Sequence, residues 1–239
     1  MNINWNPDNP DNYDPYKAAS NPKLEWKRMF SFDDYLATIV SFWENALEKH
    51  TQYISDLYWE VESGKTEMQG ELDYALFEEN KFPEFENDSF SSFFIMIYSY
   101  MESELLWYCR DLEKRNPQSV LLSDLAGGNS VEKFMTYLIK VQHIEFSKEE
   151  SPEWAKVKDF TLLRNCIVHN QGRVDDSFSK KKELLKFIQR QDSKLKLEDT
   201  TCILDKNFCS YALGIIKRFL DSVAAAKKPK VPRENASLK

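Results

Sequence analysis

The feature that most constrains this chain is a run of apolar residues that repeats with the period of an α-helix. Gaps of three or four residues predominate in the series Phe94, Ile97, Tyr98, Met101, Leu105, Tyr108 and Leu112. A β-strand would instead alternate at every second residue. The run predicts one long helix that begins near Asp88 or Ser89 and ends at Arg115, before Asn116 and Pro117.

Four further segments show the same period and carry helix boundary signals. These predicted helices span residues 31–62, 130–144, 152–171 and 207–226. We expect Ser31, Ser130 and Ser151 to be N-caps, and Pro152 suits the first helical position because its missing N–H is not needed there. Gly172 is the expected left-handed residue that ends the third of these helices.

The segments between these helices predict shorter elements. Gly64, Gly70 and Pro83 interrupt an acidic stretch that we interpret as loop and short helix. A short helix is expected over 183–190, and apolar alternation between Lys194 and Leu204 indicates a small hairpin. The sequence therefore predicts an all-α fold, a helical bundle with a possible small β-hairpin before the last helix.

The two ends of the chain differ in composition from the helical part. Four prolines in residues 1–30 predict an irregular N-terminal extension, and residues 227–239 read as a disordered basic tail. Residues 31–226 then form one helical domain.

Charge and cysteine usage narrow the possible functions. A net charge of −7 argues against a broad surface for nucleic acid or anionic membrane, so any nucleic-acid contact must be local. The four cysteines form no CxxC pair and no zinc-ligand spacing, so we expect a reduced, cytoplasmic protein without metal or cofactor. The longest apolar stretch is too short for a membrane span.

Arg164, Asn165 and His169, near the end of the predicted helix 152–171, form the candidate catalytic site. Arg164 offers a permanent charge suited to phosphate, and His169 can exchange a proton near neutral pH. Asn165 and His169 share a helical face, and Arg164 lies roughly 140° around the helix from His169. All three side chains could therefore border one cleft. Metal-free RNA cleavage needs a base, a cation and an acid, of which one copy supplies only part. A homodimer through these helices would complete the set.

The stretch from Leu162 to Gly172 resembles the RxxxxH motif of HEPN domains, a superfamily of helical ribonucleases that includes toxins and antiphage defence proteins. The resemblance implies a HEPN-like bundle and a metal-independent endoribonuclease that cleaves RNA by 2'-hydroxyl attack, with Arg164 and His169 catalytic and Asn165 at the polar position after the Arg. It also implies an acidic residue on the helix before the motif, for which Glu102 is our first choice and Glu104 the second. An RNA such as a tRNA is the implied substrate, and a cognate inhibitor or defence partner is an implied partner.

Other interpretations stay open at this stage. A HEPN-like protein that no longer cuts could bind RNA, nucleotide or a protein as a scaffold, which the overall acidity favours. An unrelated helical interaction protein could carry the motif by chance. Arg164 could also simply pair with Asp159 or Glu102, and His169 could be a C-terminal histidine that interacts with the helix dipole.

Overall fold

The structure is a computed structural model that describes residues 27–127, 130–190 and 194–226. It is all-α, with a two-stranded hairpin before the last helix, as predicted. Residues 1–26 of the predicted extension and the predicted tail 227–239 lie outside the described residues. The α-helices are α1 (Lys27–Glu62), α2 (Gln69–Glu79), α3 (Phe82–Arg115), α4 (Val131–Thr136), α5 (Pro152–Asn170), α6 (Lys181–Ile188) and α7 (Lys206–Ala225).

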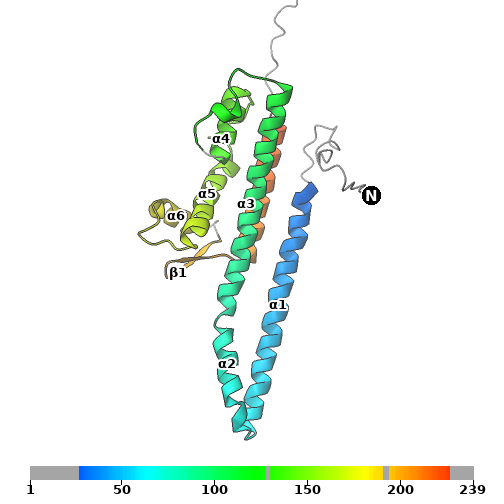
Figure 1. Ribbon diagram of the computed structural model, residues 1–239, viewed down its shortest axis with the longest axis vertical. Coiled ribbons are helices and arrows are strands. Elements are labelled where there is room, and N and C mark those ends of the chain that lie inside the picture. Colours follow the sequence, from blue (N-terminus) through cyan, green and yellow to red (C-terminus); the bar gives the residue numbers. More distant parts are fainter. Residues whose placement is uncertain (1–26, 128–129, 191–193, 227–239) are drawn as a thin grey trace, which may run out of the picture.

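Short elements complete the fold. They are the 3-10 turns η2 (Thr66–Met68) and η3 (Leu122–Asp124), the π-helical turn η4 (Tyr137–Val141), and the strands β1 (Lys196–Glu198) and β2 (Thr201–Ile203). Figure 1 shows α1 and α3 as long neighbouring rods, with α4, α5 and α6 on the other side of α3. None of the described helices is long and apolar enough to cross a bilayer.

Helix α1 starts earlier than predicted. It already contains residues 27–30, which we had assigned to the irregular extension, so Ser31 lies inside the helix and is not its N-cap. No proline or glycine occurs between Lys27 and Ser31 to stop the helix from extending toward the N-terminus. Leu36, Ile54 and Leu57 of this helix are buried, and Ile39 and Val40 are partly buried against the core.

The acidic segment after α1 is more helical than predicted. Gly70 lies within α2, and α3 begins at Phe82 instead of Asp88 or Ser89. Pro83 falls in the first turn of α3, where its missing N–H leaves no intrahelical bond unmade. Glu71, Asp73, Glu84 and Glu86 are exposed, so these carboxylates are compatible with helix and did not require a loop here.

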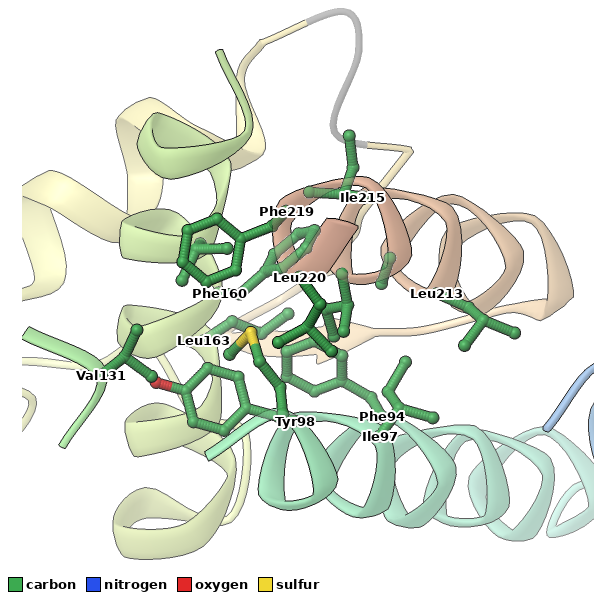
Figure 2. Close-up of a cluster of buried hydrophobic side chains, with 14 of the residues drawn as sticks. Phe94, Ile97, Tyr98, Val131, Phe160, Leu163, Leu213, Ile215, Phe219 and Leu220 are labelled. Atoms are coloured by element: carbon green, nitrogen blue, oxygen red, sulfur yellow. The ribbon is translucent and has the colours of Figure 1, made fainter. Parts of the chain in front are cut away.

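The core lies where α3, α5 and α7 meet. Phe160 of α5 makes edge contacts with Phe94 of α3 and Phe208 of α7, at centroid distances of 5.7 and 6.0 Å. Figure 2 shows side chains from these three helices converging, among them Phe94, Ile97, Phe160, Leu163, Phe219 and Leu220. The predicted periodic series of α3 therefore faces this core, and Tyr108 is the member of that series that is only partly buried.

Several predicted helix ends are confirmed. The side chains of Ser130 and Ser151 accept hydrogen bonds from backbone N–H groups three residues later, at the starts of α4 and α5. Asp205, which was not among the predicted N-caps, accepts the corresponding bond at the start of α7. The helix after Ser130 ends as the π-helical turn η4, at Val141 and not at Ile144.

The hairpin is attached to the segment that follows α5. Strands β1 and β2 pair in antiparallel register, with Leu197 opposite Cys202. The Cys202 N–H donates to the Gly172 carbonyl at 2.9 Å, and the Val174 N–H donates to the Thr200 carbonyl at 2.6 Å. Left-handed geometry begins at Gln171 (φ 52°), one residue before the predicted Gly172 (φ 76°). These contacts fix where the final turn of α5 points.

Candidate functional site

A polar pocket of about 260 Å³ lies where the middle of α5 meets α3 and the start of α4. Arg164 and Asn165 reach it from α5, and Glu102 reaches it from α3. The remaining lining residues are Tyr98, Ser130, Val131, Glu132, Trp154, Lys158, Thr161 and Leu162. The structure thus brings three of the four predicted site residues together, from helices about 60 residues apart in the sequence.

Arg164 is partly buried and holds an unused donor. Its Nη1 donates to the Asn165 side-chain oxygen at 3.1 Å. Its Nε is buried and has no hydrogen-bond partner within the described part of the chain. Asp159, which could have paired with it, is bound instead to Arg190. A buried N–H without an acceptor destabilises the protein, so an oxygen-bearing ligand at this point would relieve that cost.

Glu102 and Tyr98 form the α3 side of the pocket. Burial raises the pKa of the Glu102 carboxyl, and the nearby Arg164 guanidinium partly opposes that rise. Burial likewise raises the pKa of Tyr98 to about 12. Thr161 donates its hydroxyl hydrogen to the Val157 carbonyl at 2.9 Å, so the Tyr98 hydroxyl is the donor in its 2.8 Å bond to Thr161. Figure 2 shows this hydroxyl directed toward Val131 at the start of α4.

His169 lies apart from the pocket within one copy of the chain. It occupies the last turn of α5, is exposed, and is not among the lining residues. It lies five positions after Arg164 on the helix, a rise of about 7.5 Å and a rotation of about 140°. The expectation that all three motif residues border one cleft therefore holds for Arg164 and Asn165 but not for His169. Glu104, the second acidic choice, does not line the pocket either.

No family model, curated protein or solved structure matches this chain. We therefore infer its function from the geometry and chemistry of its own residues.

Sequence reasoning missed Lys158 and Thr161 of the pocket. They precede Asn165 by seven and four residues on the same helix, and that spacing places all three on one face. The signal was present in the sequence but was not used. Ser130 and Glu132 come from α4, and only the packing of α4 against α3 and α5 brings them here. No local pattern indicated that contact.

The pocket chemistry suits an anionic group. Arg164 and Lys158 are the cations, and the Asn165 amide and the Ser130 hydroxyl can add hydrogen-bond donors. Glu102 and Glu132 also line the pocket, so an anion there must contact the two cations and avoid the two carboxylates. Its volume is below that of pockets that enclose a drug-sized ligand, so it can hold one group of a larger molecule. Elsewhere in the described residues, no cluster of three or more His, Cys, Asp or Glu side chains is placed to hold a metal ion.

Proposed function

We propose that this protein is a metal-independent endoribonuclease that works as a homodimer. One observation carries the proposal: Arg164 lines a polar pocket and keeps a buried donor without a partner among the described residues, on the same helix whose last turn exposes His169. The first group suits a phosphate, and the second can take or give a proton near neutral pH.

The chemistry that we propose conserves protons across the two copies. The neutral His169 imidazole of one copy removes the proton from a 2'-hydroxyl, and that oxygen attacks the adjacent phosphorus. The bond from phosphorus to the 5'-oxygen breaks as the protonated His169 of the second copy donates its proton to the leaving oxygen. Arg164 stabilises the extra negative charge on the phosphate. The products are a 2',3'-cyclic phosphate and a 5'-hydroxyl.

Asn165 and Glu102 act as positioning residues in this proposal. Asn165 holds one guanidinium nitrogen of Arg164, which fixes the guanidinium at the edge of the pocket that it lines. Glu102 lies close enough to Arg164 for the guanidinium to lower the pKa of the Glu102 carboxyl. That carboxylate would also limit how tightly an anion binds. Exposed Val168, next to His169, supplies apolar surface on which the two α5 ends could meet.

The distribution of charge supports RNA as the substrate. Residues 89–226, which include α5 and the lining residues of the pocket, contain 20 basic and 19 acidic side chains. The net acidity of the chain thus comes from the segment before them. The part that carries the candidate site is compatible with a polyanion.

Cleavage of a labelled RNA in the presence of EDTA tests the proposal. Wild-type protein should give 2',3'-cyclic ends, and His169→Ala or Arg164→Ala should reduce the rate by at least about 100-fold. His143→Asn is the matched control, because it removes an exposed histidine outside the site and asparagine tolerates its positive φ of 54°. Unchanged cleavage by His169→Ala would overturn the proposal.

A non-catalytic scaffold is the second candidate, because the structure keeps His169 outside the pocket within one copy. Such a protein would bind RNA through Arg164 and leave it intact under every condition tested. The resemblance to HEPN domains also suggests a setting, the effector of a toxin or antiphage system with a cognate inhibitor. Activity that appears only with the product of a neighbouring gene would support that setting.

A further inference from the structure

Residues 45–86 form a projecting arm, built from the second half of α1, η2, α2 and the start of α3. Figure 1 shows this arm extending beyond the level of β1, away from α4, α5 and α6. From Asn45 to Glu62 alone, α1 rises about 27 Å. A separate small cluster of Ile54, Leu57, Leu72 and Ala75 holds the arm together.

The arm exposes an unusual share of the large apolar side chains. Twelve such side chains are exposed in the described residues, and seven of them lie in the arm. These seven are Leu47, Tyr53, Tyr58, Trp59, Tyr74, Phe77 and Phe85. Trp59 is 72% exposed. Tryptophan and tyrosine are the residues that most often dominate the energy of protein interfaces, so this surface suits a protein partner.

The charge of the arm restricts that partner. The arm carries eleven acidic and three basic side chains, a net charge of −8. Such a surface repels nucleic acid and anionic membranes, and it attracts a positively charged protein surface. Two arms placed against each other would also repel, which disfavours a contact between arms.

The chain itself contains a surface of the opposite sign. The described residues 180–190 and 194–196, which include α6 and the first residue of β1, hold seven basic side chains and one acidic side chain, a net charge of +6. Lys182, Lys186, Lys194 and Lys196 are exposed and form no ion pair with the described residues. We call this segment the basic face. Within one copy it lies beside α5, away from the end of the arm (Figure 1).

We propose that the arm of one copy docks on the basic face of a second copy. Exposed aromatic side chains of the arm would supply buried apolar area, and the carboxylates around them would pair with the unpaired lysines. In a two-fold dimer, both copies make this contact at once, because residue i meets j and j meets i. The contact stands on exposure and charge, and it does not depend on RNA cleavage.

Sedimentation equilibrium on the full chain, from about 1 μM to about 100 μM, tests this contact. Wild-type protein should associate, and about 0.5 M salt should weaken the association because it screens the charges. The arm variant Trp59→Ser/Phe77→Ser and the face variant Lys182→Glu/Lys186→Glu/Lys196→Glu should each weaken it at least about 10-fold. Matched controls on the body, Val120→Ser and Lys114→Glu/Lys140→Glu, should leave it unchanged, and circular dichroism should show all variants folded.

Mixing the arm variant with the face variant decides how the copies meet. Each keeps the surface that the other lacks, so the mixture should form a heterodimer although each variant alone is monomeric. A wild-type protein that stays monomeric over the whole range overturns the proposal. The proposal is also overturned if the arm variant alone is monomeric while the face variant alone associates as well as wild type. In that case the copies meet through their arms.

Discussion

The arm and the body of this protein are built on the same two helices but differ in how those helices are covered. In the body, α1 and α3 are joined by α4, α5 and α7, and one large cluster buries aromatic side chains completely. In the arm, only the short η2 and α2 join them among the described elements, and four residues form the buried cluster. Apolar periodicity runs through both parts. The number of covering helices decides whether the apolar residues become core or exposed surface.

The largest effect should come from Phe160→Ala in the body. Phe160 is fully buried and contacts the rings of Phe94, Phe187, Phe208 and Tyr211. We expect a loss of about 3–5 kcal/mol in the free energy of unfolding, because the cavity lies where three helices meet and cannot collapse easily. Urea denaturation followed by circular dichroism measures it. A loss below about 1 kcal/mol would show that the body is loosely packed.

Leu57→Ala should have a smaller and more local effect in the arm. Leu57 is 3% exposed in a cluster of four, and its truncation should destabilise the arm by about 2 kcal/mol. Hydrogen exchange should speed up in α2 and the second half of α1, and protection in α5 and α7 should stay unchanged. Equal loss of protection in both parts would mean that the arm and the body fold as one unit.

Sequence reasoning predicted the body better than the arm. Helix α7 was placed within one residue at each end, because its apolar stripe is unbroken. In the arm, acidic residues with Gly70 and Pro83 suggested a loop, although a proline in the first turn and solvent-facing carboxylates are compatible with helix.

The same division applies to the candidate site. Arg164 and Asn165 could be picked from one local motif, and Glu102 was chosen from a resemblance. The contribution of Ser130 and Glu132 depends on tertiary packing of α4, which no local pattern encodes. The helical rotation between Arg164 and His169 places His169 outside the pocket. The spacing of the two residues in the sequence could not show this, because it does not tell which side of α5 the pocket lies on.

Glu102→Gln should show that burial in the body has an electrostatic consequence. Burial raises the pKa of this carboxyl above its usual 4.5, so the folded state favours the protonated form. Wild-type stability should therefore fall as pH rises through the interval between 4.5 and the raised pKa. The amide does not ionise, so the stability of the variant relative to wild type should be higher at pH 7 than at pH 4. Thermal unfolding at the two pH values measures this, and an equal difference at both would contradict it.

The smallest effect on the free energy of unfolding should come from Trp59→Ser in the arm. The same change at Trp154 in the body serves as the comparison. Trp154 is 4% exposed, lies beside Phe219 with ring centroids 5.9 Å apart, and has the Lys148 ammonium over its ring. Its loss should destabilise the body by about 3–5 kcal/mol. Trp59 is largely exposed, so its loss should change the unfolding free energy of dilute, monomeric protein by no more than about 0.5 kcal/mol. Urea denaturation at low protein concentration separates this effect from any loss of association. A large destabilisation by Trp59→Ser under those conditions would show that the exposed aromatics support the fold of the arm, so that their exposure would no longer argue for a protein partner.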